Sequence, residues 1–245
     1  MNNKTGKIIL VGAGCGDPEL LTLKAVRVLK TADVVLYDAL VSAEVLEFVN
    51  TQAEKISVGK KGHGLSCRQI DINSMMVKFA LEGKIVVRLK GGDPLIFSRA
   101  AEEMEAAKEA GIAVEIVSGI TTTQAVAATL GFPLTHRESA RRLQFVTGHD
   151  HKGGLPEGLD WQALADKNAT TVVYMPKKTL AAMSKKLQEF GLPATTSALA
   201  IMDATLPTQK IITGTVATLP QSVENANMEG AVLVIIGEVT APLIG

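Results

Sequence analysis

Short runs of continuous apolar residues alternate with segments of helical period in the first half of the chain. Such runs, rich in Val and Ile, are typical of strands covered on both faces. The predicted strands span residues 7–12, 33–38, 84–89 and 113–117. The predicted helices span residues 19–32, 42–50, 70–82 and 99–110. Alternating βα units of this length predict a parallel sheet that binds ligands at the carboxyl ends of its strands.

The pattern changes after residue 133. Strands predominate there, and the pattern predicts a single long helix over residues 178–190. The predicted strands span residues 143–148, 170–175, 197–202, 209–215 and 232–237. With so few helices to form crossovers, this half should hold a mixed or antiparallel sheet. We therefore expect an α/β protein of two domains, residues 1–133 with a parallel sheet and residues 134–245 with a mixed one.

The composition agrees with layered α/β cores and narrows the choice of partners. Apolar residues make up 47% of the 245 residues and aromatic residues only 4%, so the cores should be aliphatic. The 25 Lys and Arg residues balance the 25 Asp and Glu residues, so no net field attracts nucleic acid or a membrane. The first residues lack the apolar core of a signal peptide, and no apolar run approaches the roughly 20 residues of a membrane span. A cytoplasmic compartment is expected.

The arginines of the chain predict a binding patch, whereas its cysteines and histidines predict neither a disulfide scaffold nor a metal site. Five of the seven arginines fall in a stretch of 55 residues, which predicts a local patch suited to carboxylates. These are Arg88, Arg99, Arg137, Arg141 and Arg142. The two cysteines are too few for a disulfide scaffold, and neither they nor the four histidines have metal-ligand spacing. We assign no metal.

The turn after the strand at 84–89 carries the clearest chemical signal. Gly91 and Gly92 let a ligand approach bare backbone, and Asp93 adds an acceptor beside the amides. The glycine-rich loop at 12–18 fails the dinucleotide spacing, because Asp17 stands where the third glycine should be. The pattern therefore predicts a neutral or mildly acidic cradle without phosphate character. A tight βα turn with an Asp cap is the plainer interpretation of the 12–18 loop.

Eight segments, in order along the chain, together resemble the uroporphyrinogen-III C-methyltransferase family of tetrapyrrole methyltransferases. They are GAGCGDP (12–18), VVLYDALV (34–41), VGKK (58–61), VVRLKGGDPLIFSR (86–99), VSGITT (117–122), GFPLTHR (131–137), FVTGH (145–149) and VYM (173–175). The resemblance extends over nearly the whole chain. It implies two α/β domains with S-adenosylmethionine in the cleft between them, S-adenosylhomocysteine as a product, and a homodimer.

The resemblance also implies roles for single residues. The implied cofactor contacts are Cys15, Gly91, Gly92, Asp93, Ile96, Thr121, Thr122, Met175 and Ala204. The implied substrate anchors are Arg99, Glu102 and Arg137, and the first and last of these suit carboxylates. Asp38 is the implied proton acceptor and Lys60 the implied proton donor, with Arg99 as a second candidate for the base.

Taken one at a time, several of these residues have plainer interpretations. Met175 also fits ordinary core packing, and Asp38 fits a turn cap. Lys60 fits an exposed charge, and Glu102 fits a surface ion pair with Arg99.

The activity implied by the resemblance is methylation of uroporphyrinogen III at two pyrrole carbons, C2 and C7. The product would be precorrin-2, reached by way of precorrin-1, in siroheme or cobalamin-type biosynthesis. Ser98, Ala100 and Ala101 stand where the family has glycines, so the shape of the substrate pocket stays open. The alternatives are a methyltransferase for a later corrin precursor or a non-tetrapyrrole substrate, a non-catalytic tetrapyrrole-binding protein, and a nicotinamide dehydrogenase.

Overall fold

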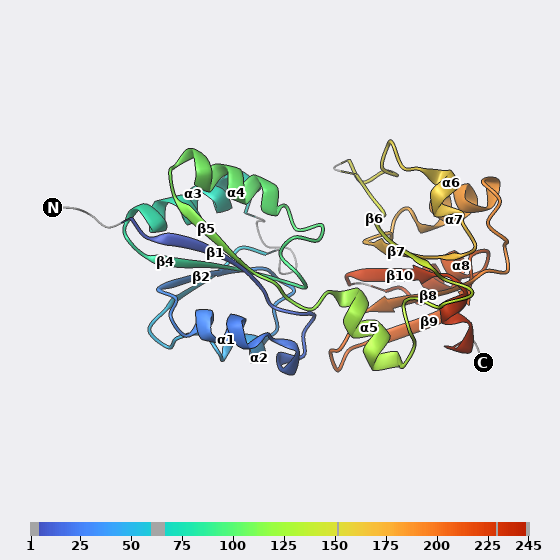
Figure 1. Cartoon of the computed structure of the whole chain (residues 1–245), viewed down its shortest axis with the longest axis horizontal. Helices are drawn as coiled ribbons and strands as arrows, with labels where there is room; N and C mark the ends of the chain where they lie inside the picture. The colour runs from blue at the N-terminus through green and yellow to red at the C-terminus, as the bar shows by residue number, and fades with distance from the viewer. Residues whose placement is uncertain (1–4, 60–66, 151, 229, 244–245) are drawn as a thin grey trace. The chain divides into compact units, whose positions relative to one another are not determined.

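The computed structural model describes residues 5–59, 67–150, 152–228 and 230–243. The chain packs as two compact units, residues 1–122 and 123–245. Each unit contains one five-stranded sheet (Figure 1).

The first unit is built on a parallel sheet in the order β3-β2-β4-β1-β5. Its strands are β1 (Lys7–Gly12), β2 (Val34–Tyr37), β3 (Glu54–Ser57), β4 (Ile85–Lys90) and β5 (Ala113–Val117). Its helices are η1 (Pro18–Leu20), α1 (Leu23–Leu29), α2 (Ala43–Leu46), α3 (Gln69–Leu81) and α4 (Ala100–Glu109). Because neighbouring strands pair in parallel, the loops that follow them gather at the carboxyl edge of the sheet.

Side chains that alternate along each strand form two apolar layers in this unit. In β1, Ile9 and Val11 pack in the layer that includes α1 and α2, whereas Ile8 and Leu10 pack in the layer that includes α3 and α4. Figure 1 shows the two helix pairs on opposite faces of the sheet. Burial of both faces explains why the strands appear in the sequence as unbroken apolar runs.

The second unit is built on a mixed sheet in the order β6-β7-β10-β8-β9. Its strands are β6 (Arg142–Thr147), β7 (Ala169–Tyr174), β8 (Ser197–Met202), β9 (Lys210–Thr215) and β10 (Val232–Ile236). Its helices are α5 (Thr122–Leu130), α6 (Trp161–Leu164), α7 (Leu180–Glu189), α8 (Leu219–Asn225) and η2 (Glu238–Leu243). Since β10 is antiparallel to both β7 and β8, the last two run in the same direction and end at the same edge.

The second sheet is also covered on both faces. Helices α6, α7 and α8 pack with Val173 and Val234 on one face. Helices α5 and η2 pack with Val172, Leu199 and Ile235 on the other. The predicted α/β class, with a parallel first sheet and a mixed second sheet, is confirmed.

The prediction of one helix over residues 19–32 is wrong. Asp17 caps only the short turn η1, accepting a hydrogen bond from the Glu19 N–H (2.8 Å), and the backbone at Leu21 is extended. A new helix, α1, then begins after Thr22, whose hydroxyl accepts a hydrogen bond from the Ala25 N–H (3.1 Å). Two successive N-caps therefore divide the segment.

The division between the packed units falls at the start of α5, after its first residue, Thr122. A domain boundary at 133/134 groups α5 with the first domain, whereas Val126 and Ala127 of α5 pack with the second sheet. As a division into functional domains, residues 1–133 and 134–245 stay a prediction. Within the part of the chain that the structure describes, no helix has the length and apolar character needed to cross a membrane.

Replacing Leu199 by Ala is expected to destabilise the second unit strongly, because Leu199 is fully buried between α5 and the sheet. We expect a loss of about 2–5 kcal/mol in the free energy of unfolding, measured by denaturant titration. Ile211→Ala on the neighbouring strand β9 is the control, since Ile211 is 41% exposed. Equal losses in the two variants would contradict this packing.

Candidate functional site

Two loops meet at the carboxyl edge of the first sheet, after β1 and β4. The Gly14 N–H donates to the Gly92 carbonyl (3.3 Å), and the Gly92 N–H donates to the Gly14 carbonyl (2.6 Å). The Ala13 N–H donates to the carbonyl of Lys90 (2.8 Å). The chain leaves β1 towards β2 and leaves β4 towards β5, on opposite sides of this strand pair. Such a switch point is where open α/β sheets bind ligands.

A third loop, after β5, packs against the first two at glycine positions. A Cβ atom on Gly119 would lie 2.3 Å from the Gly92 carbonyl oxygen, and one on Gly12 would lie 2.5 Å from the Gly119 nitrogen. The Gly119 N–H also donates to Asp93 Oδ2 (3.0 Å). Only residues without a side chain allow three backbones to approach this closely. The edge is therefore formed largely by backbone.

The loop that links β4 to α4 is held by its own polar groups. Asp93 Oδ1 accepts a hydrogen bond from the Leu95 N–H (2.8 Å), and the Ser98 hydroxyl donates to the Pro94 carbonyl. Phe97 and Arg99 adopt left-handed backbone conformations, with φ of 49° and 63°. Non-glycine residues in this region are strained, and such strain is common at ligand-binding loops.

The three loops that meet here are neutral to acidic. The loops spanning 13–17, 91–98 and 118–122 contain no Lys or Arg, and their only charged residues are Asp17 and Asp93. Cys15, Ile96, Thr121 and Thr122 are all partly exposed along these loops. The arrangement offers backbone donors and acceptors with no counter-charge for phosphate, as the sequence predicted.

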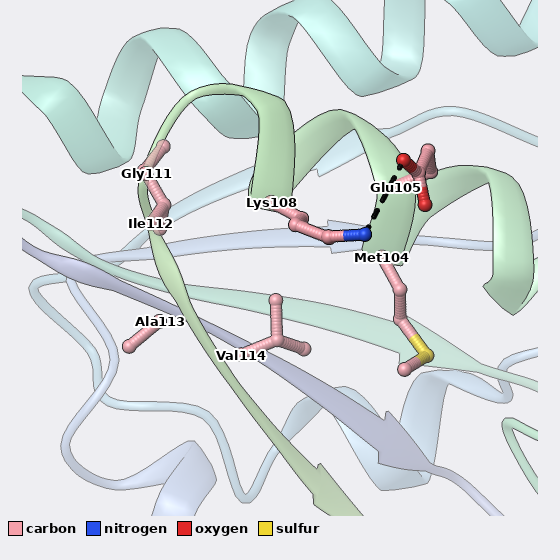
Figure 2. A pocket seen from close by; sticks show the side chains of 7 residues that line it. All are labelled: Met104, Glu105, Lys108, Gly111, Ile112, Ala113 and Val114. Atoms are coloured by element: carbon pink, nitrogen blue, oxygen red, sulfur yellow. Dashed lines mark ion pairs between the residues drawn. The ribbon is translucent and has the colours of Figure 1, made fainter.

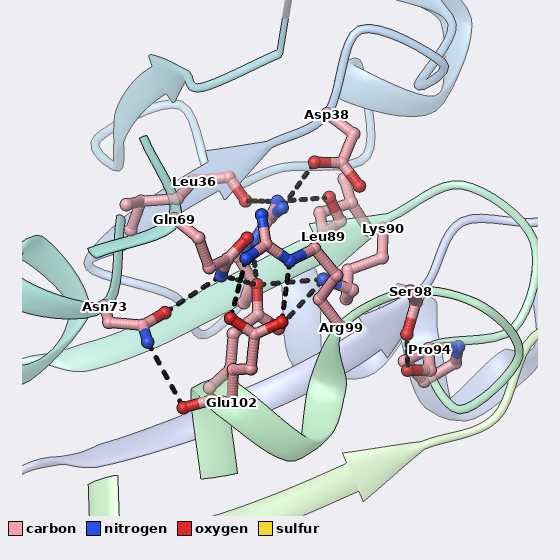
Figure 3. A network of polar contacts seen from close by, with 12 residues as sticks. Leu36, Asp38, Gln69, Asn73, Leu89, Lys90, Pro94, Ser98, Arg99 and Glu102 are labelled. Carbon is pink, nitrogen blue, oxygen red and sulfur yellow. Dashed lines mark hydrogen bonds and ion pairs between the residues drawn. The ribbon is translucent and has the colours of Figure 1, made fainter. Parts of the chain in front are cut away.

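A network of buried charges joins β4 to α4, the two elements that the loop at 91–99 connects. Arg88 and Lys90 are each 2% exposed, and Glu103 of α4 is 1% exposed. Arg88 Nε donates to Glu103 Oε1 (2.9 Å), and Lys90 Nζ contacts both Glu103 oxygens (2.8 Å each). Gln69 Nε2 adds a further hydrogen bond to Glu103 Oε1 (3.2 Å). The network is drawn in Figure 3.

Asp38, the predicted proton acceptor, is the partly exposed end of this network. Its side chain is 29% exposed, and Oδ1 accepts a hydrogen bond from Arg88 Nη2. Burial, together with the positive charge of Arg88, lowers the pKa of Lys90 from its usual value, and Glu103 opposes that shift. The burial of Arg88 corrects one expectation, because this arginine faces the protein interior and takes no part in a surface patch.

Arg99 and Glu102 form an exposed two-point ion pair at the start of α4. Arg99 Nε and Nη2 each donate to one Glu102 oxygen at 2.7 Å. These hydrogen bonds raise the pKa of Arg99 and lower the pKa of Glu102. The surface ion pair suggested by their spacing is present. A guanidinium held in its charged form fits a carboxylate anchor better than a base.

Two of the predicted cofactor residues lie at one edge of the second sheet. Met175 follows β7, has a φ of 58° and is 39% exposed, so it does not fill the core. Its N–H donates to the carbonyl of Val232 (3.1 Å) at the start of β10. Ala204 follows β8 between Asp203 and Thr205, which have φ of 52° and 68°. The side chain of Ala204 is buried, so its backbone is the part available to a ligand.

Arg137 and Lys60 are the remaining predicted site residues. Arg137 is exposed in a turn of the second unit, closed by backbone hydrogen bonds between His136 and Ala140. Lys60 lies outside the described residues. Among the described residues, no group of three or more His, Cys, Asp or Glu side chains is arranged to hold a metal ion.

A surface pocket of about 530 Å³ lies elsewhere on the first unit, against α4 and β5 (Figure 2). It is lined by Met104, Glu105, Lys108, Gly111, Ile112, Ala113 and Val114. Most of these residues lie at the amino end of β5, opposite the edge where the loops meet. None of the residues predicted from the sequence to form the site lines this pocket.

Sequence reasoning missed Glu103, Lys90 and Gly119 as parts of the site. One signal for the ion pairs was present, since positions 88 and 90 place two cations on the same face of a buried strand. Such cations require a buried anion nearby. Which acid supplies it depends on how α4 packs. Gly119 stood within the VSGITT segment, but its contact with Gly92 is a long-range one.

Comparison with known proteins links these features to one family. A family model described as Tetrapyrrole (Corrin/Porphyrin) Methylases matches residues 7–220. The chain is 44% identical over 234 residues to a siroheme synthase of Thiobacillus denitrificans, covering 96% of this chain and 48% of that protein. It is also 44% identical over 234 residues to an S-adenosyl-L-methionine-dependent uroporphyrinogen III methyltransferase of Arabidopsis thaliana, covering 96% and 63%. The chain spans about half the length of the siroheme synthases that it matches and 63% of the Arabidopsis thaliana protein.

Solved structures give the same result. A uroporphyrin-III C-methyltransferase from Thermus thermophilus, in complex with S-adenyl homocysteine, matches with a TM-score of 0.82 and 36% identity. That match covers 97% of this chain and all of the other. A cobalt precorrin-4 methyltransferase matches with a TM-score of 0.84 and 27% identity, covering 97% of each chain.

Replacing Gly119 by Ala is expected to disrupt the junction of the three loops, because the added Cβ would overlap the Gly92 carbonyl. We expect a loss of roughly 1–3 kcal/mol in the free energy of unfolding of the first unit, measured by thermal and denaturant unfolding. Ser118→Ala is the control, since Ser118 is exposed. Unchanged stability of Gly119→Ala would show that the loops do not approach this closely.

Proposed function

Because the chain belongs to the tetrapyrrole (corrin/porphyrin) methylase family, we propose that it methylates uroporphyrinogen III at two pyrrole carbons, C2 and C7. The methyl donor is S-adenosylmethionine, and the product is precorrin-2, formed by way of precorrin-1. The single observation that carries this choice is the 44% identity to a uroporphyrinogen III methyltransferase over nearly the whole chain.

The loop edge of the first unit is suited to such a donor. S-adenosylmethionine is a sulfonium cation, and the loops there hold two carboxylates and no Lys or Arg. Gly92 has a φ of 70°, and a Cβ placed on it would meet nothing closer than the Thr122 hydroxyl at 4.0 Å. An edge of bare backbone is thus open to an adenine or amino-acid group.

The proposed cofactor contacts are the nine residues that the family resemblance implies. In the first unit they are Cys15, Gly91, Gly92, Asp93, Ile96, Thr121 and Thr122. In the second unit they are Met175 and Ala204. The exposed thioether of Met175 is a soft, adaptable surface for an apolar part of the cofactor.

The substrate is a polycarboxylate, which accounts for the proposed roles of two arginines. Arg99 and Arg137 are exposed, and a guanidinium group offers several N–H donors to carboxylates. Glu102 holds the Arg99 guanidinium in a fixed orientation before substrate binds. Ser98, Ala100 and Ala101 then shape the adjoining surface.

The reaction needs little covalent help from the protein. Bound S-adenosylmethionine would supply an electrophilic methyl group, and its sulfur would keep the electron pair of the broken C–S bond. The chain aligns the nucleophilic pyrrole carbon with that methyl group and excludes water. Asp38 accepts the proton that the adjacent meso carbon then loses. Lys60 is the proposed proton donor, and its position lies outside the described residues.

The same proposal includes the compartment, the oligomeric state and the pathway of the enzyme. It is a cytoplasmic homodimer that acts in siroheme or cobalamin-type biosynthesis. Its balanced charge supports a small-molecule substrate over a nucleic acid or membrane partner. The close structural match to a cobalt precorrin-4 methyltransferase favours a later corrin precursor as the second candidate substrate.

The proposal is tested by incubating the purified protein with S-adenosylmethionine and uroporphyrinogen III under reducing, anaerobic conditions. We expect two methyl groups to be added, detected by mass spectrometry and by the absorbance of the product. A panel of later corrin precursors is assayed in parallel. Binding of S-adenosylhomocysteine without methylation of uroporphyrinogen III would reject this substrate and leave the family assignment intact.

Replacing Arg137 by Ala is expected to weaken tetrapyrrole binding at least about tenfold, the effect of losing one charged hydrogen-bond partner. The dissociation constant for S-adenosylhomocysteine, measured by calorimetry, should change by less than about twofold. Lys186→Ala is the control, since Lys186 pairs with Glu189 at the surface of the same unit and lies outside the predicted arginine patch. Equal losses of both ligands in Arg137→Ala would show that Arg137 acts on the fold.

A further inference from the structure

Arg88 makes more polar contacts than a cation needs for charge balance. Its Nε donates to Glu103 (2.9 Å), and its Nη1 donates to the carbonyls of Leu36 (3.3 Å) and Leu89 (3.2 Å). Its Nη2 donates to Asp38 Oδ1. Each of the three guanidinium nitrogens therefore has a fixed partner, and the plane of the group is set by the β2 and β4 backbones as well as by α4.

The partners that hold Arg88 are themselves held. Glu103 is fully desolvated and accepts further hydrogen bonds from Lys90 and Gln69. Figure 3 shows Gln69 and Lys90 directed into the network and Asp38 at its far side. Since a buried guanidinium has few alternative partners, its Nη2 presents one orientation to Asp38.

The charges of this network balance only when Asp38 is counted. Arg88 and Lys90 carry two positive charges, and Glu103 carries one negative charge. Asp38 supplies the second negative charge and is the one charged member of the four with substantial exposure. The Asp38 carboxylate is thus the charged group through which this buried network reaches solvent.

We propose that Arg88 is a positioning residue, anchored by Glu103, that fixes the Asp38 carboxylate for proton transfer. The inference rests on the proposed function, in which Asp38 accepts the proton. Arg88 touches neither substrate nor cofactor in this scheme and acts only through Asp38. A lysine at position 88 keeps the charge, but its single ammonium cannot reproduce the contacts of three fixed nitrogens.

A double-mutant cycle tests the proposal, using kcat and KM of the full chain with uroporphyrinogen III. The variants are Arg88→Lys, Asp38→Asn and the double variant. We expect Arg88→Lys to lower kcat at least about tenfold with KM within about twofold, because a displaced base slows only the chemical step. Asp38→Asn should lower kcat at least about a hundredfold. The double variant should then match Asp38→Asn, since Arg88 has no other route to the reaction.

A second variant keeps the test decisive if Arg88→Lys misfolds. Glu103→Asp keeps every charge but withdraws the anchoring carboxylate by one methylene group. It should lower kcat in the wild-type background and leave kcat of Asp38→Asn unchanged. Arg68→Lys is the matched control, because Arg68 also pairs with an aspartate, Asp71, but on the exposed start of α3. It should retain wild-type kcat.

The possible failures are distinguishable. Losses that multiply in the double variants, or a normal kcat in Arg88→Lys and Glu103→Asp, would overturn the positioning role alone. A normal kcat in Asp38→Asn would remove the proposed acceptor, and this inference with it, while methyl transfer stands. A wild-type protein that binds S-adenosylhomocysteine but does not methylate uroporphyrinogen III would overturn the proposed function and the inference that rests on it.

Discussion

Two cations buried on one face of β4 impose the strongest constraint on the first unit. Arg88 and Lys90 occupy strand positions that elsewhere hold aliphatic side chains, and buried cations are tolerated only beside anions. Glu103 supplies that charge from α4, so the helix is held against the strand by ion pairs as well as by apolar packing. Because the loop at 91–99 joins Lys90 to the start of α4, the same ion pairs set the separation of its two ends.

The loop held in this way forms one side of a surface made mainly of backbone. Gly12, Gly92 and Gly119 bring three chain segments into contact, and residues 13–17, 91–98 and 118–122 of these segments include no Lys or Arg. Phosphate groups would find donors there but no counter-charge, whereas a sulfonium ligand meets a neutral or acidic surface. The family's cofactor and the local electrostatics therefore agree, although they rest on separate observations.

The second unit offers a different kind of surface at the shared end of β7 and β8. Met175, Asp203 and Thr205 all adopt left-handed backbone conformations there, which non-glycine residues avoid unless the surroundings enforce them. The enforcing contacts include the hydrogen bond from Met175 to Val232 and one from the Thr205 N–H to Gln209 Oε1 (2.8 Å). Such strained turns are typical of positions that present backbone to a ligand, which agrees with the proposed roles of Met175 and Ala204.

The sequence by itself determined every described strand except β3, together with the class of each sheet, the glycine turn and the family, because these depend on local periodicity and on contiguous motifs. It could not separate η1 from α1, since Asp17 and Thr22 are both suited to cap a helix and lie only five residues apart. Only the tertiary structure decided that Met175 is exposed, that Arg88 is buried, and that Glu103 is the anion between Arg88 and Lys90. These outcomes depend on which helix packs over which strand, and that choice is made by contacts between residues far apart in the chain.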